Sequence, residues 1–197
     1  MLVLGLTGSL ATGKSTAAAM FAELGVATFN ADRAVHDLYA GEAAPLIEAA
    51  FPGTTANGVV DRPRLAARVL GDKAALARLE AIVHPLVHEA ENRFRAAAAA
   101  AGRRIILLDI PLLLETGGEG RVDAVVVVTT SPEIQRERVL KRGVSEERYV
   151  ALTARQMPDA EKRKRAHFII DTSGEYDATR KQIADVVRAV GGMAAGG

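Results

Sequence analysis

The stretch Gly8-Ser9-Leu10-Ala11-Thr12-Gly13-Lys14-Ser15 decides the fold class of this chain. It matches the pattern G-x-x-x-x-G-K-[ST] at every fixed position. An apolar run, residues 2–7, precedes it, and a segment rich in helix formers, residues 15–24, follows it. A strand, a glycine-bounded loop and the start of a helix form a phosphate-binding loop, whereas a chance glycine-rich turn would lack these neighbours. The stretch therefore predicts an α/β protein that binds the phosphates of a nucleoside triphosphate.

The residue types in this loop explain how it would hold phosphate. Gly8 and Gly13 allow backbone angles that direct successive N–H groups around one phosphate. The helix that starts here adds the positive end of its dipole. We expect Lys14 to reach the β- and γ-phosphates of ATP and the Ser15 hydroxyl to bind Mg²⁺. The other residues of this segment predicted to contact the nucleotide are Ala11, Thr12 and Thr16.

Strands and helices alternate along the rest of the chain. Apolar runs at residues 26–29, 104–109, 122–129 and 167–171 predict four further strands, and their continuous apolar character is typical of parallel strands covered on both faces. The chain is therefore expected to form a five-stranded parallel sheet flanked by helices. Residues 33–101 contain no convincing strand, so we expect a helical insertion there, with helices at residues 43–50, 63–70, 72–82 and 85–101.

Composition limits the classes of function. A length of 197 residues suits one α/β core with small insertions, and the absence of Cys excludes disulfides and thiolate zinc sites. No apolar stretch is long enough to span a membrane, and the first residues lack the basic segment of a signal peptide. The net charge of +1 argues against a general nucleic-acid binder. We expect a cytoplasmic protein that has a small-molecule substrate and no nucleic-acid or membrane partner, as a monomer or small homo-oligomer.

Charge is concentrated in one segment. Residues 136–165 carry ten Lys or Arg against five Asp or Glu. A solvated helical face is the ordinary explanation for most residues of such a run. The alternative is a mobile arm that closes over phosphates.

Two acidic residues follow predicted strands. Asp32 comes shortly after the 26–29 run, and Asp109 ends the 104–109 run. Because the carboxyl ends of parallel strands face the ligand crevice, Asp32 could accept or orient the proton of a hydroxyl nucleophile, and Asp109 could support a metal ion. A helix N-cap is the alternative for Asp32, and a cap or turn is the alternative for Asp109.

The histidines give no metal-ligand pattern. His84 and His88 lie one helical turn apart, but no third ligand is evident nearby. A structural role is the alternative for His84, as it is for His36.

Taken in order, segments along nearly the whole chain resemble the dephospho-CoA kinase family. The segments that carry this resemblance are Gly5-Leu6-Thr7-Gly8, Gly13-Lys14-Ser15-Thr16, Phe21–Gly25, Asn30-Ala31-Asp32, His36–Tyr39, Ile82–Val87, Asp109–Glu115, Arg138–Arg142 with Ser145-Glu146-Glu147, Arg155-Gln156, Glu161-Lys162-Arg163 and Phe168–Gly174. The phosphate loop is specific by itself, and the other segments are specific through their order.

The resemblance implies a P-loop kinase fold and one reaction. In that reaction ATP, with Mg²⁺, phosphorylates the ribose 3′-hydroxyl of dephospho-CoA to give CoA and ADP, the last step of coenzyme A biosynthesis. It also implies three parts, which agree with the pattern of elements described above. These are a nucleotide-binding core at residues 1–32, 102–135 and 166–197, a helical substrate domain at residues 33–101, and a helical lid at residues 136–165.

The resemblance also assigns roles to single residues. The family's catalytic Asp falls on Asp32, which would act with Lys14 and the lid residue Arg142. Arg138 and Arg142 would bind ATP, since guanidinium groups match phosphate oxygens. Substrate contacts would come from His84, in its His-Pro pair, and from Arg163 as well as Asp32. Asp109 would support the metal together with Ser15, directly or through water, and Glu115 falls on the acid that closes the same segment.

The chain departs from the family pattern in several places. Ser9-Leu10-Ala11-Thr12 contains less Gly than usual, and Asn30 stands where the first Asp of an Asp-Ala-Asp segment is common. The loss of this carboxylate at Asn30 is expected to weaken the positioning of metal or hydroxyl. His167 replaces a usual Asp, and the turn at residues 141–145 is one residue shorter.

Three other functions remain open from the sequence. One is a different P-loop small-molecule kinase, acting on a nucleoside monophosphate or a sugar acid. Another is a nucleotide-binding regulatory protein, although a guanine-reading Asn-Lys-x-Asp segment is absent from the sequence. The third is a family member that has lost activity and serves as a scaffold.

Overall fold

The computed structural model describes residues 1–154 and 156–193. Arg155, which belongs to one of the resembling segments, lies outside the described residues. The chain divides into two compact units, one formed by Met1–Phe29 with Ala98–Gly197 and the other by Asn30–Ala97. No helix among the described residues is long and apolar enough to cross a membrane.

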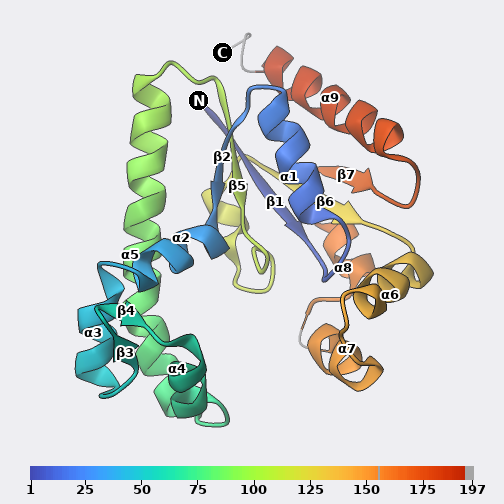
Figure 1. The fold of residues 1–197 in the computed structure, drawn as a ribbon. Coiled ribbons are helices and arrows are strands. Elements are labelled where there is room, and N and C mark those ends of the chain that lie inside the picture. The colour runs from blue at the N-terminus through green and yellow to red at the C-terminus, as the bar shows by residue number, and fades with distance from the viewer. Residues whose placement is uncertain (155, 194–197) are drawn as a thin grey trace. The chain divides into compact units, whose positions relative to one another are not determined.

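The first unit is built on a parallel β-sheet, shown in Figure 1. In β1, Leu4 lies opposite Leu107 on one side and Ala124 on the other. This confirms the predicted five-stranded parallel sheet. Its strands, in spatial order, are β2 (Ala27–Asn30), β5 (Ile105–Asp109), β1 (Leu2–Gly8), β6 (Ala124–Thr129) and β7 (Phe168–Asp171).

Helices cover the sheet because its strands are apolar on both faces. On one face, Leu4 and Leu6 belong to a buried core shared with α1 (Lys14–Glu23) and α9 (Tyr176–Met193), which lie side by side in Figure 1. Val125 and Val127 belong to a separate buried cluster with Leu113 and Leu114. Alternate side chains of β6 thus enter different clusters, as the two-residue repeat of a strand requires.

Three helices and one short turn complete this unit. They are η1 (Gly118–Arg121), a 3₁₀ turn, and the helices α6 (Pro132–Lys141), α7 (Glu146–Thr153) and α8 (Asp159–Lys164). Ser131 and Ser145 accept backbone hydrogen bonds at the starts of α6 and α7, as Ser residues at N-caps do. The sequence analysis did not predict η1, whereas α8 falls within the segment predicted as a helical lid.

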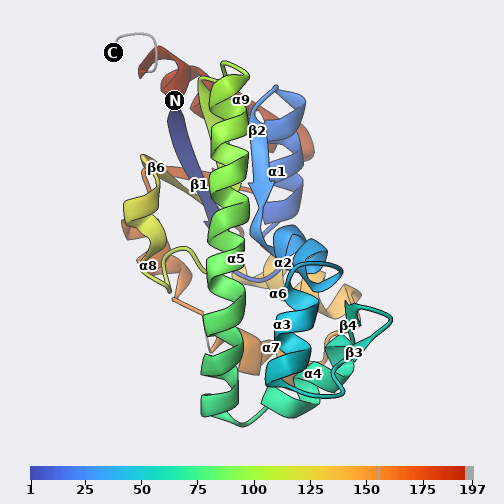
Figure 2. The ribbon, with the colours of Figure 1, turned by 90° about the vertical axis from the view of Figure 1, so that its left-hand side faces the viewer.

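The second unit is mainly helical. Its elements are α2 (Ala31–Tyr39), α3 (Ala43–Ala50), the two-stranded hairpin β3 (Thr55–Ala56) and β4 (Val59–Val60), α4 (Arg62–Val69) and most of α5 (Lys73–Ala100). Leu38, Ile47, Leu65 and Leu79 bring α2, α3, α4 and α5 into one buried core. Figure 2 shows the hairpin beside α3 and α4.

Two expectations for this unit are wrong. The hairpin is a short strand pair where no strand was expected; Asn57 and Gly58 both have positive φ, as its tight turn requires. The two helices predicted at residues 72–82 and 85–101 are one continuous helix, with Pro85 inside it (Figure 2). Pro85 removes one backbone hydrogen bond, but the buried Leu79 and Val83 anchor the helix just before it.

Candidate active site

The phosphate loop joins β1 to α1, as predicted. A Cβ added to Gly8 would lie 2.6 Å from the Val128 carbonyl oxygen and 2.8 Å from Thr12 Oγ1, so only Gly fits there. Gly13 is the N-cap of α1 and has φ of 88°, in the left-handed region. The first N–H groups of a helix have no partner inside the helix, and here they follow the loop directly. The loop and α1 therefore form an anion site.

The loop interior is tightly folded without glycine. Ala11 is buried and has φ of 60°, a conformation that costs an L-residue about 1–2 kcal/mol. The Ser9 carbonyl accepts hydrogen bonds from Thr12 N, at 3.3 Å, and from Thr12 Oγ1, at 2.9 Å. Side-chain and backbone bonds thus close the turn.

Lys14 and Asp109 form an ion pair between Nζ and Oδ1. Asp109 ends β5 opposite Leu6 of β1, and its side chain is fully buried. Lys14 is the first residue of α1 and keeps 14% of its side chain exposed. The structure therefore brings together two residues that the sequence predicted to be functional, one with the phosphate loop and one as metal support.

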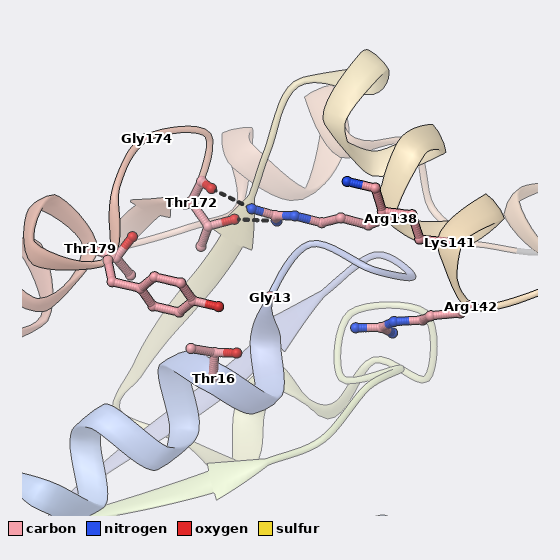
Figure 3. Close-up of a pocket in the computed structure, with 9 residues that line it drawn as sticks. Gly13, Thr16, Arg138, Lys141, Arg142, Thr172, Gly174 and Thr179 are labelled. Atoms are coloured by element: carbon pink, nitrogen blue, oxygen red, sulfur yellow. Dashed lines mark hydrogen bonds between the residues drawn. The ribbon is translucent and has the colours of Figure 1, made fainter.

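A pocket of about 310 Å³ opens beside the loop. Figure 3 shows Arg138, on α6, and Arg142, which directly follows α6, extending towards it. The predicted residues Thr16, Arg138 and Arg142 thus share one hollow with the loop. The pocket is lined by Gly13, Thr16, Arg138, Lys141, Arg142, Thr172, Gly174, Tyr176 and Thr179.

Thr172 links the pocket to the loop. Arg138 donates to Thr172 Oγ1 at 2.9 Å and to the Thr172 carbonyl at 2.7 Å, as drawn in Figure 3. The Thr172 hydroxyl donates in turn to the Thr12 carbonyl at 2.6 Å. The sequence analysis missed Thr172, Tyr176 and Lys141, because their place in the pocket depends on how α6 and the segment after β7 pack together.

Arg163 lies in a different hollow of the first unit. That hollow has a volume of about 450 Å³ and also contains Thr12, Asp159 and Asp171. A hydrogen bond from the Ser173 side chain, helped by the Arg163 charge, holds the pKa of Asp171 below its usual value. Arg163 is not among the described residues that line the first pocket, so its predicted contact with substrate stays a prediction.

Asp32 lies in the second unit, in the first turn of α2. The N-cap of this helix is Asn30, whose side chain accepts a hydrogen bond from Arg33 N at 2.7 Å. The alternative that Asp32 serves as the N-cap is therefore wrong. An amide oxygen caps a helix about as well as a carboxylate does, so the departure at Asn30 preserves this structural role.

Asp32 lines a largely apolar pocket of about 520 Å³ within the second unit. The guanidinium carbon of Arg62 lies 5.5 Å from the centre of the Tyr39 ring, and Arg62 Nη2 lies 3.0 Å from His36 Nδ1. Sequence reasoning missed Arg62, because no local pattern distinguishes it from other exposed arginines. The pocket is lined by Asp32, Val35, Tyr39, Arg62, Leu65, Ala66, Val69 and Leu79.

His84 is exposed on α5. It is not among the described residues that line the Asp32 pocket. Its predicted contact with substrate therefore stays a prediction.

The chain is similar to known proteins over almost all of its length. A model of the dephospho-CoA kinase family matches residues 2–178. The dephospho-CoA kinase of Bradyrhizobium diazoefficiens is 61% identical over 96% of both chains. That of Brucella melitensis is 56% identical over 99% of this chain and 98% of its own.

Solved structures agree with these relatives. A Thermus thermophilus protein matches with a TM-score of 0.81 and 32% identity, over 95% of this chain and 96% of its own. The dephospho-CoA kinase of Campylobacter jejuni matches with a TM-score of 0.68 and 26% identity, over the same shares. A shikimate kinase from Bacteroides thetaiotaomicron, at 0.56 and 12% over 96% of this chain and 98% of its own, shares the fold alone. With the phosphate loop intact and the family matched from residue 2 to residue 178, the chain belongs to the dephospho-CoA kinase family.

Proposed function

We propose that Lys14, Arg142 and Asp32 carry out the reaction of this family in the present chain. The chain transfers the γ-phosphate of ATP to the ribose 3′-hydroxyl of dephospho-CoA and releases CoA and ADP, in the last step of coenzyme A biosynthesis. The observation that carries this function is the family match across residues 2–178, which includes the intact phosphate loop. Neither a regulatory switch nor a different small-molecule kinase accounts for that match.

On the ATP side, the site works by positioning and electrostatics. Backbone N–H groups of the phosphate loop and of the first turn of α1 would surround phosphate, and the α1 dipole favours its charge. When phosphate enters, Lys14 exchanges its contact with Asp109 for phosphate oxygens. Arg138 and Arg142 lie in the adjoining pocket, where guanidinium groups stabilise the charge that spreads over the transferring group.

Mg²⁺ fits the donors at this place. The described residues contain no cluster of three or more His, Cys, Asp or Glu that could hold a metal. Mg²⁺ commonly takes one or two protein oxygens, and phosphate and water supply the rest. The Ser15 hydroxyl and the Asp109 carboxylate, directly or through water, would be those oxygens. The ion would neutralise charge on the β- and γ-phosphates.

Asp32 is the residue we assign to the acceptor hydroxyl. Its carboxylate would orient the 3′-hydroxyl and accept its proton during in-line transfer. Two features support this assignment: the capping role belongs to Asn30, and Asp32 is exposed and lines a pocket. The retained cap at Asn30 also weakens the case for an inactive scaffold.

The rest of the substrate would bind along the Asp32 pocket. Arg62, held against Tyr39, suits the diphosphate of dephospho-CoA, because guanidinium and phosphate form paired hydrogen bonds. The apolar side chains of Leu65, Val69 and Leu79 suit the pantetheine arm.

The predicted parts of the chain also remain our proposal. Residues 33–101 would form the substrate domain and residues 136–165 the lid, with His84 and Arg163 as further substrate contacts. Closure of a lid would exclude water and limit hydrolysis of ATP. We also propose a cytoplasmic location.

One assay tests the proposed function. ADP release by the purified chain with ATP and Mg²⁺ is measured without acceptor, with dephospho-CoA, and with a panel of nucleoside monophosphates and sugar acids. Release that depends on dephospho-CoA, with CoA as the second product, supports the proposal. Release that is equal without acceptor, or faster with a panel member, rejects it.

A further inference from the structure

The apex of the phosphate loop is held from outside the loop. Leu10 N donates a hydrogen bond to Gln156 Oε1 at 3.0 Å, and the Leu10 carbonyl accepts one from Gln135 Nε2 at 2.7 Å. Gln135 lies on α6, and Gln156 follows α7. Both backbone polar groups of one loop residue are therefore bound by side chains that lie more than a hundred positions away in the sequence.

The two glutamines have opposite polarity towards Leu10. The Tyr149 hydroxyl, on α7, donates to Gln135 Oε1 at 3.3 Å. This contact directs the amide nitrogen of Gln135 towards the Leu10 carbonyl. Gln135 thus donates a hydrogen bond to the loop, whereas Gln156 accepts one. To reverse either role, the side-chain amide would have to rotate by about 180°.

These bonds flank the strained residue of the loop. Ala11 has φ of 60°, and such a conformation persists in an L-residue where its surroundings fix it. Before Ala11, both polar groups of Leu10 are bound by the glutamines; after it, the Thr12 carbonyl accepts a hydrogen bond from Thr172 at 2.6 Å. In a loop with few glycines, hydrogen bonds from outside the loop therefore stabilise a backbone conformation that glycine would adopt without strain.

We propose that Gln135 and Gln156 are positioning residues that hold the phosphate loop in its phosphate-binding conformation through the Leu10 backbone. Neither side chain needs to touch the nucleotide. If a smaller fraction of molecules has a competent loop, the apparent affinity falls by that fraction. The clamp formed by Gln135, Gln156 and Leu10 therefore couples the packing of α6 and α7 to the affinity of the loop for phosphate.

The test uses two variants with the same added charge. Gln156→Glu keeps an acceptor for Leu10 N–H, whereas Gln135→Glu places an acceptor against the Leu10 carbonyl. General repulsion of ATP is common to both variants, because both carboxylates lie beside the same loop residue. Losing one hydrogen bond and leaving its partner unpaired corresponds to about tenfold in affinity. We expect Gln135→Glu to weaken binding of a non-hydrolysable ATP analogue about tenfold more than Gln156→Glu does.

Two uncharged variants and a double-mutant cycle distinguish a positioning role from a general loss of stability. Gln135→Leu and Gln156→Leu are expected to raise the KM for ATP several-fold with little change in kcat. Adding Ala11→Gly removes the strained side chain, so the penalty of each Leu variant is expected to shrink in a double-mutant cycle. A purely structural role would lower thermal stability without this dependence on Ala11.

The analogue is titrated without dephospho-CoA, so the result stands apart from the acceptor assay that tests the proposed function. Equal affinities of the two Glu variants would overturn the clamp. Wild-type affinity in both Leu variants would also overturn it.

Discussion

Replacing Lys162 by Met breaks a buried ion pair that no local pattern reveals. Lys162 lies on α8 and has no exposed side-chain surface, and its Nζ is 2.8 Å from Glu115 Oε1. Removing one partner of a buried pair costs about 3–5 kcal/mol, because the other charge stays buried. Glu115 keeps 14% of its side chain exposed and accepts a hydrogen bond from Met157 N at 3.0 Å, so the lower figure applies. We therefore expect a loss of about 3 kcal/mol, or about 6–12 °C in Tm.

Denaturant unfolding and calorimetry of the variant measure this loss. Lys164→Met is the matched control, since Lys164 lies on the same helix with 70% of its side chain exposed, and a surface pair contributes little. The double variant with Glu115→Gln and Lys162→Met is expected to recover much of the loss, because no buried charge remains. If Lys162→Met is no less stable than Lys164→Met, the pair does not stabilise the fold and the reasoning is refuted.

The same pair gives a pH dependence. Burial opposes ionisation of Glu115, but the contact with Lys162 and the hydrogen bond from Met157 N outweigh it and hold the pKa of Glu115 below its ordinary value of 4.5. A lowered folded pKa stabilises the fold at pH above the unfolded value, and this contribution is lost as pH falls through the folded value. The difference in free energy of unfolding between wild type and Glu115→Gln should be full at pH 7 and shrink below about pH 4.5. A difference that stays constant to pH 3 would contradict the ion pair.

Three further predictions concern the reaction. Asp32→Asn is expected to lower turnover by about 100-fold or more, while ATP affinity without acceptor stays near wild type; near-normal turnover would remove Asp32 from the mechanism. Lys14→Ala is expected to weaken ATP binding and to lower turnover about 100-fold, and titration with steady-state kinetics checks both; an effect on turnover alone would contradict a phosphate contact in the ground state. Arg62→Ala is expected to raise the KM for dephospho-CoA about tenfold with the KM for ATP unchanged. Arg64→Ala, an exposed arginine on the same helix, is the matched control, and equal effects of the two would refute the diphosphate contact.

The parts of the fold that the sequence predicted are those with contiguous signals. The phosphate loop is one unbroken segment, and its residue types follow from its chemistry. The strand Ala124–Thr129 is buried at every position. Its sequence is therefore a continuous run rich in β-branched residues, and that run predicts a strand. The parallel sheet followed from such runs alternating with helices.

The rest depends on contacts between distant residues. Lys162 stands in a run of charged residues typical of a solvated face, yet it is fully buried, so for this residue that interpretation is wrong. Arg62 meets Tyr39 only because α2 and α4 share a core. Leu10 and Gln135 are 125 positions apart. In each case the environment comes from packing, which no local pattern encodes.

The glycine content of the phosphate loop follows from the same distinction between local and distant constraints. Gly8 is required because a Cβ would lie 2.6 Å from the carbonyl oxygen of Val128, a backbone atom of the paired strand β6. At position 11 the constraint is only a positive φ, whose cost of about 1–2 kcal/mol is partly offset because Ala has less freedom than Gly in the unfolded chain. Hydrogen bonds to Leu10 and Thr12 then hold Ala11 in the positive-φ conformation that a glycine would adopt without strain. Glycine is therefore retained where backbone atoms leave no space, and it is dispensable where the surrounding helices hold the loop.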